Sequence, residues 1–98
     1  MSDILDDNKI KENLKSLDGW VIKNNLLYKK FSFKTFMNAF SFMNIIADQS
    51  EKVDHHPKLI NEYNTVEIEL YTHSLDGITK KDFSLAGFMD NIYEEIFS

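Results

Sequence analysis

The chain has 98 residues, of which 43% are hydrophobic and 13% aromatic; it is long enough for one hydrophobic core and too apolar for a disordered protein. The absence of cysteine excludes disulfide frameworks, thiolate catalysis and cysteine-bound zinc. The formal net charge of −5 and the absence of arginine argue against direct nucleic-acid binding, because the charge repels phosphates and arginine is the usual reader of guanine.

The sequence shows no signal for a membrane or for secretion. No apolar run approaches the length of a membrane span, and residues 1–11 lack the apolar region of a signal peptide. We therefore expect a soluble, cytoplasmic protein that forms a single domain over residues 1–98 and does not bind membranes.

The N-terminal part predicts a short helix and then a hairpin. Asp6 or Asp7 can cap the helix, Gly19 is placed as its stop, and its apolar positions recur at helical spacing: Ile10, Leu14 and Leu17. Residues 20–23 and 26–31 are apolar and aromatic runs separated by Asn24-Asn25. Because asparagine tolerates positive φ, this pair predicts a tight turn between two strands.

A long amphipathic helix is predicted from Phe33 to about Val53. Its apolar residues recur every three or four positions and are expected to face the core: Phe33, Phe36, Met37, Phe40, Met43 and Ala47. Pro57 pushes the preceding residue, His56, out of the α conformation, so the helix should end near Asp54 or His55. Two adjacent histidines therefore lie at a helix end.

Residues 59–63 and 66–73 predict a second hairpin that turns at Asn64-Thr65. In its later strand Val66, Ile68 and Leu70 alternate with polar residues, which indicates one buried face. After a turn at Asp76-Gly77, a capping box from Thr79 to Asp82 opens a final helix. The positions expected to face inward in this helix are Leu85, Phe88, Met89, Ile92 and Ile96.

The order of these elements is helix-ββ-helix-ββ-helix. Each hairpin alone is marginally stable, and the amphipathic helices need a partner surface. The sequence therefore predicts an α+β fold of two layers, in which a four-stranded antiparallel sheet is covered on one face by helices. The opposite face is left for solvent or for a second subunit.

All three histidines fall between Glu51 and Asp82. Glu51 precedes His55 by four positions, so on a helix its carboxylate could orient that imidazole, although an ordinary surface pair has the same spacing. His56 and His73 could face one pocket or lie separately at the surface. Imidazoles give and take protons near neutral pH, so two of them can supply the acid and base steps of a dehydration.

Other chemistries are less compatible with the sequence. A metal site would need the three histidines with Glu51, but adjacent histidines at a helix end diverge and neither HxH nor HExxH occurs. No Gly-x-Ser-x-Gly motif is present for a serine nucleophile. Asp82, in a capping box, is expected to serve its helix first. We expect no metal and no cofactor.

Several segments stand out together by residue type and spacing: Glu51-Lys52-Val53-Asp54-His55-His56-Pro57, Tyr63-Asn64, Thr72-His73, Gly77-Ile78-Thr79 and Asp82. They resemble the pterin-4a-carbinolamine dehydratase family, and the resemblance extends through Gly19-Trp20, residues 31–39 and Leu85-Ala86. It implies dehydration of 4a-hydroxytetrahydrobiopterin to quinonoid dihydropterin and water by histidine acid and base catalysis. In the family this step recycles tetrahydrobiopterin for an aromatic amino-acid hydroxylase and needs no metal or prosthetic group.

The resemblance also assigns site residues. It implies catalytic roles for His55, His56 and His73, with Glu51 and Asp82 in support. The positions implied to contact substrate are Pro57, Leu59 and Thr72. The family usually has an acidic residue and then tryptophan after His-His-Pro, whereas this chain has Lys58 and Leu59. Without that aromatic wall we expect a raised KM before a lowered kcat.

The resemblance implies a homodimer or homotetramer and leaves two alternative functions. Some relatives act as dimerisation cofactors of a homeodomain transcription factor, which here would need an exposed apolar face such as one with Tyr93 and Phe97. Others are thought to act on a different pterin, such as one in molybdopterin metabolism. The complete histidine set favours dehydration of the carbinolamine.

Overall fold

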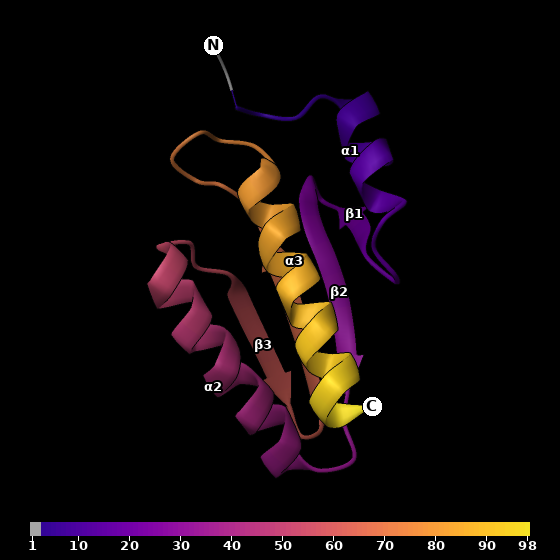
Figure 1. The fold of residues 1–98 in the computed structure, drawn as a ribbon, viewed down its shortest axis with the longest axis vertical. Helices are drawn as coiled ribbons and strands as arrows, with labels where there is room; N and C mark the ends of the chain where they lie inside the picture. The colour runs from indigo at the N-terminus through magenta and orange to yellow at the C-terminus, as the bar shows by residue number, and fades with distance from the viewer. Residues whose placement is uncertain (1–2) are drawn as a thin grey trace.

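The computed structural model describes residues 3–98 and arranges them in two layers, with α2 and α3 side by side over one face of a sheet (Figure 1). The sheet is antiparallel throughout and its strand order is β1-β2-β4-β3. The elements are α1 (Asp7–Leu14), β1 (Val21–Lys23), β2 (Leu26–Ser32), α2 (Phe36–Val53), β3 (Lys58–Glu62), β4 (Thr65–Leu70), α3 (Lys80–Ile92) and a π-helical turn, η1 (Tyr93–Phe97). The predicted α+β fold is confirmed. Among these residues no helix is both long and apolar enough to cross a bilayer.

The N-terminal elements follow the prediction except at the end of α1. The Asp6 side chain caps the helix by accepting from the Lys9 amide at 2.9 Å. The α-helix ends at Leu14, not near Gly19, because the next amides bond three residues back, in a tighter turn of the 3-10 type. Asn24 and Asn25 both have positive φ, 52° and 63°, as the predicted hairpin turn requires.

Helix α2 begins later than predicted and buries a different face. Thr35 caps it by accepting from the Asn38 amide at 3.0 Å, while Phe33 stays outside the helix and is buried. The buried residues of α2 are Ala39, Phe42, Ile46 and Ser50. The prediction that four residues of this helix face the core is wrong, because they are exposed: Phe36 at 43%, Met37 at 69%, Phe40 at 46%, and Ala47. Apolar residues cover more than one face of this helix, so their period alone could not identify the face that meets the sheet.

The second hairpin forms, but its turn lies one residue earlier than predicted. Tyr63, with φ 49°, and Asn64 make the turn. The side-chain amide of Asn61 donates to two backbone carbonyls at the turn, that of Tyr63 at 3.1 Å and that of Thr65 at 2.9 Å. This side-chain bridge explains why a tyrosine takes the left-handed conformation. Strand β4 ends at Leu70, before His73.

The core lies between the sheet and α2 and α3. Val66, Ile68 and Leu70 are fully buried, which confirms the predicted alternation in β4. Two aromatic residues of the C-terminal turn, Tyr93 and Phe97, pack against core rings. Those core rings belong to Phe31, Phe33 and Phe42.

The C-terminal turn corrects two predictions. Because η1 is π-helical, the residues after Ile92 do not continue the α-helical spacing, and Ile96 is 57% exposed instead of inward. Tyr93 and Phe97 are partly buried against the core, so they do not form the exposed apolar face that was considered for a transcription cofactor.

Candidate functional site

The site is built where three elements end or begin: the C-terminus of α2, the chain after β4, and the N-terminus of α3. Asp54 closes α2 in the left-handed conformation, with φ 52° and its amide donating to the Ser50 carbonyl. The His55 amide donates to the same carbonyl at 3.0 Å. This reversal turns the next side chain, that of His55, into the molecule. His56 and Pro57 lie outside the helix, as predicted from the proline.

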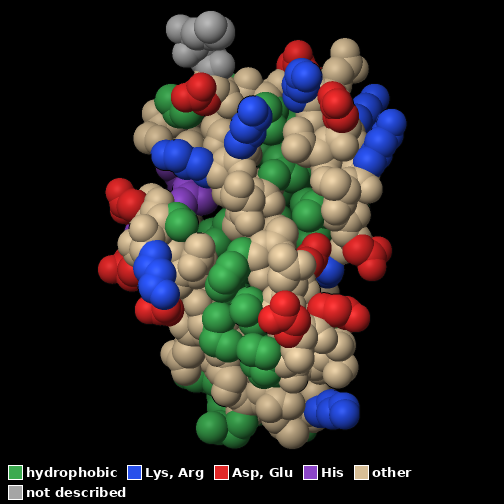
Figure 2. All heavy atoms as spheres, viewed as in Figure 1, with side chains coloured by type: hydrophobic (Ala, Val, Ile, Leu, Met, Phe, Trp, Pro, Cys, Tyr) green, Lys and Arg blue, Asp and Glu red, His purple; other side chains and the backbone are tan. Residues whose placement is uncertain are grey.

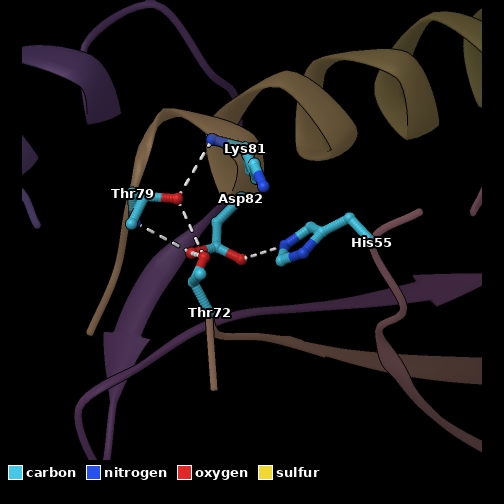
Figure 3. A network of polar contacts seen from close by, with 5 residues as sticks. All are labelled: His55, Thr72, Thr79, Lys81 and Asp82. Carbon is cyan, nitrogen blue, oxygen red and sulfur yellow. Dashed lines mark hydrogen bonds and ion pairs between the residues drawn. The ribbon is translucent and has the colours of Figure 1, made fainter. Parts of the chain in front are cut away.

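The central contact joins His55 to Asp82. The imidazole Nε2 lies 2.6 Å from the carboxylate Oδ1, and the two side chains are 9% and 0% exposed (Figure 3). The other carboxylate oxygen accepts from the Thr72 hydroxyl and the Thr79 amide, both at 2.9 Å. A fully buried carboxylate thus has three donors, as a buried charge requires.

A second hydroxyl completes this network. The Thr72 and Thr79 hydroxyl oxygens lie 2.8 Å apart, and Thr79 Oγ1 also accepts from the Lys81 amide at 3.2 Å (Figure 3). Backbone bonds between Thr72 and Gly77, at 2.9 and 3.3 Å, close the loop that brings both threonines together. The predicted capping box of Thr79 and Asp82 is present. The same carboxylate also contacts His55, and the sequence did not predict this contact.

The expected pairing of Glu51 with His55 is wrong. Glu51 Oε2 lies 2.5 Å from Nε2 of His56, and both side chains are largely exposed, at 78% and 55%. The reason is that α2 ends at Val53, so His55 does not lie one helical turn above Glu51. The left-handed Asp54 sends His55 inward and leaves His56 on the side of Glu51.

His73 lies apart from the other two histidines. It is exposed in the loop after β4, and its ring packs edge-on against Tyr71 with centroids 5.2 Å apart. The Tyr71 hydroxyl donates to Asp76 at 2.6 Å, and this bond raises the pKa of Tyr71. Among residues 3–98 no hydrogen bond or ring contact joins His73 to His55 or His56.

A cavity of about 320 Å³ opens beside the buried pair, within the size range of small-ligand sites. Its lining residues come from the end of α2, the loop after it and the start of α3: Gln49, Val53, His55, Lys80, Lys81, Ser84 and Leu85. Lysine and histidine side chains lie next to each other on the face of the molecule that Figure 2 shows. His55 is therefore the one predicted catalytic residue that lines this cavity.

The three residues predicted to contact substrate do not line this cavity. Leu59 pairs with the buried Ile68 across the sheet and packs on the core, so it lies on the helix-covered face. The Thr72 hydroxyl is engaged by Asp82 and Thr79, and Pro57 is partly buried beside His56. The described residues contain no cluster of three or more acidic or histidine side chains that could hold a metal ion.

The contact with Asp82 fixes the orientation of the His55 imidazole. An Nε2–H that donates to Asp82 fixes the neutral ring as the tautomer whose Nδ1 carries a lone pair. Within the described chain Nδ1 of His55 has no hydrogen-bond partner. It is free to accept a proton or a hydrogen bond from a bound molecule.

Comparisons with known proteins place this chain in a family. The model of the family described as pterin 4 alpha carbinolamine dehydratase matches residues 3–92. Curated relatives from Rhizobium meliloti and Sulfolobus acidocaldarius carry the provisional name pterin-4-alpha-carbinolamine dehydratase. The first is 45% identical, covering 92% of this chain and 88% of the relative. The second is 44% identical, covering 90% and 97%.

Two solved structures are similar. The crystal structure of a transcriptional coactivator/pterin dehydratase from Brucella melitensis matches with a TM-score of 0.88 and 40% identity, over 91% of this chain and 97% of that one. A pterin dehydratase-like protein identified as a RuBisCO assembly factor in the alpha-carboxysome matches with a TM-score of 0.62 and 23% identity, over 74% and 84%. The second comparison supports the fold alone.

Proposed function

Because this chain belongs to the pterin 4 alpha carbinolamine dehydratase family, we propose that it converts 4a-hydroxytetrahydrobiopterin to quinonoid dihydropterin and water. The observation that carries the proposal is the buried His55–Asp82 pair at 2.6 Å, with His55 lining a cavity of about 320 Å³. An imidazole held in one orientation at a small-ligand cavity can bind the pterin ring and position it for proton transfer.

The proposed reaction needs two proton transfers. An acid protonates the 4a-hydroxyl, the C4a–O bond breaks and water leaves. A base removes the proton from N5, and its bonding electrons form the C4a–N5 double bond. Histidines can do both near neutral pH, so the proposal requires no metal or prosthetic group.

We assign the acid and base to His56 and His73, and ring binding to His55. His56 is exposed and held by Glu51, while His73 is exposed in the loop that follows the site threonine, Thr72. Asp82, not Glu51, is the residue that orients His55.

The proposed physiological setting follows the family. Quinonoid dihydropterin would be reduced again to tetrahydrobiopterin, the cofactor of an aromatic amino-acid hydroxylase in the cytoplasm. This proposed link depends on membership of the family and on the dehydration step.

The direct test is an assay of carbinolamine disappearance with wild type, His56→Ala and His73→Ala. We expect each substitution to lower kcat by about 10²-fold or more, the usual contribution of a general acid or base. Lys34→Ala, an exposed residue before α2, is the control and should match wild type. If both histidine variants keep wild-type turnover, the assignment of these two residues is wrong.

We also propose that the chain forms a homodimer or homotetramer through α2. Phe36, Met37 and Phe40 form an exposed apolar stripe on this helix, and the rings of Phe36 and Phe40 pack on each other at 5.3 Å. A two-fold axis would place the same stripe of a second copy against it. Burial of these side chains away from water supplies the driving force.

A further inference from the structure

The cavity beside His55 has an unusual charge for this protein. The whole chain carries a net charge of −5, yet the described residues that line this cavity include Lys80 and Lys81 and no aspartate or glutamate. Asp82 lies behind it, but its oxygens already accept from His55, Thr72 and Thr79. The cavity is therefore basic in an acidic protein.

The two lysines are not explained by protein partners. Within residues 3–98 neither Lys80 nor Lys81 makes an ion pair. They are the first two residues of α3, where the positive end of the helix disfavours cations. Local rules broken without a compensating contact are typical of functional sites.

The cavity also contains a polar group that points to a ligand. The His55 side chain is 9% exposed, lines the cavity, and its Nδ1 has no partner among the described residues. In Figure 3 the Lys81 side chain extends on the side of Asp82 where His55 lies. A separate cavity of about 340 Å³ shares both lysines but also includes Asp3, so an anion would favour the His55 side.

We propose that this site also accepts, and prefers, pterins whose side chain carries an anionic group, a phosphate or a carboxylate, which Lys80 and Lys81 bind. This inference rests on the proposed function and extends its substrates beyond biopterin, whose side chain is neutral. The dehydration itself takes place at C4a and N5, so a charge on the side chain leaves the reaction unchanged. The lysines would select the substrate without taking part in proton transfer.

The test compares the binding of matched oxidised pterins by the quenching of their fluorescence. The probes are 6-hydroxymethylpterin, its phosphate ester and 6-carboxypterin. We expect wild type to bind at least one anionic probe about 10- to 100-fold more tightly than the neutral probe, the range for hydrogen bonds to charged groups. Added salt should reduce this preference, because it screens exposed charges. The tighter of the two anionic probes identifies the group that the site prefers.

Variants assign the preference to the two lysines. Lys80→Gln with Lys81→Gln should bring the anionic and neutral probes to nearly equal affinity and leave the neutral probe unaffected. Lys34→Gln removes one exposed positive charge elsewhere and should keep the wild-type preference.

The outcomes separate this inference from the proposed function. If wild type dehydrates the carbinolamine but binds the neutral and anionic probes equally, or the double variant keeps the preference, the anionic substrate is ruled out and the function stands. If no pterin binds and the carbinolamine is not dehydrated, the proposed function fails and this inference fails with it.

Discussion

The imidazole of His55 and the carboxylate of Asp82 meet at 2.6 Å in the interior, although 27 residues separate them in the chain. The contact depends on the left-handed Asp54 at the end of α2 and on the capping box at the start of α3. One carboxylate therefore stabilises a helix terminus and orients an imidazole. A substitution at Asp82 should affect both the stability of the fold and the function of the site.

The pair of His56 with Glu51 should matter for activity more than for stability. Both side chains are largely exposed, so Glu51→Gln should change the free energy of unfolding by less than about 1 kcal/mol. If His56 transfers a proton, the weaker contact should lower kcat about fivefold, the worth of one ordinary hydrogen bond. Urea denaturation and the dehydratase assay measure the two effects.

A matched control lies on the same helix end. Lys52 pairs with Asp48 at 3.1 Å and is similarly exposed, so Lys52→Gln should change neither quantity. Equal kcat values for Glu51→Gln and Lys52→Gln would show that the Glu51 contact does not serve catalysis.

The apolar stripe of α2 predicts a specific loss of assembly. Phe40→Glu would place a charge in the proposed interface and should convert the oligomer to monomers, because burying an unpaired carboxylate is costly. Ile96→Glu changes a residue of similar exposure outside the stripe and should leave the mass unchanged. Light scattering after gel filtration measures the mass of each variant. A wild-type monomer, or an oligomer that survives Phe40→Glu, would argue against this interface.

Two buried hydroxyls should respond in opposite ways to removal. Ser50 Oγ is buried and has no hydrogen-bond partner among the described residues, so Ser50→Ala should leave stability unchanged or raise it by about 1 kcal/mol. Thr72→Val removes the hydroxyl between Asp82 and Thr79 and should cost about 1–3 kcal/mol. Urea unfolding of both variants tests this difference. A large loss for Ser50→Ala would reveal a partner for its hydroxyl.

Tyr28 predicts a loss of stability at alkaline pH. Its hydroxyl donates to Glu67 at 2.6 Å, and this bond, with desolvation and the nearby negative charge, raises the pKa of Tyr28 from 10.0 to about 12. The folded state keeps the proton that the unfolded state loses, so this contribution is complete below pH 10 and falls as the pH rises toward 12. Tyr28→Phe should show a smaller decrease of the unfolding free energy over that range. Parallel decreases for both proteins would contradict the assignment to Tyr28.

Features set by neighbouring residues could be predicted from the sequence. The Asn24-Asn25 turn, the Thr79 capping box and the exit of His56 from α2 each follow from the chemistry of a few adjacent residues. The alternation in β4 was equally readable, because a half-buried strand has a period of two. These features gave the correct order of elements and the correct fold class.

Features set by distant residues could not be predicted. The buried face of α2 depends on how the helix meets the sheet, and the left-handed Tyr63 depends on the Asn61 side chain. The partner of His55 depends on a single left-handed residue, Asp54, at the helix end. Helical spacing therefore suggested Glu51 for a position that Asp82 occupies. One signal in the sequence pointed to this contact. The capping box uses one carboxylate oxygen of Asp82, so the other oxygen needs a donor of its own.

The central claim is that His55, held by Asp82, serves the dehydration of a pterin carbinolamine, and the most direct measurement is the dehydration rate of wild type against Asp82→Asn. Asparagine keeps the shape and an acceptor oxygen but removes the charge. We predict that wild type accelerates the reaction above its spontaneous rate and that Asp82→Asn loses about 10- to 100-fold of kcat/KM while remaining folded. A folded Asp82→Asn with the wild-type rate, or a wild type with no acceleration, would contradict the claim.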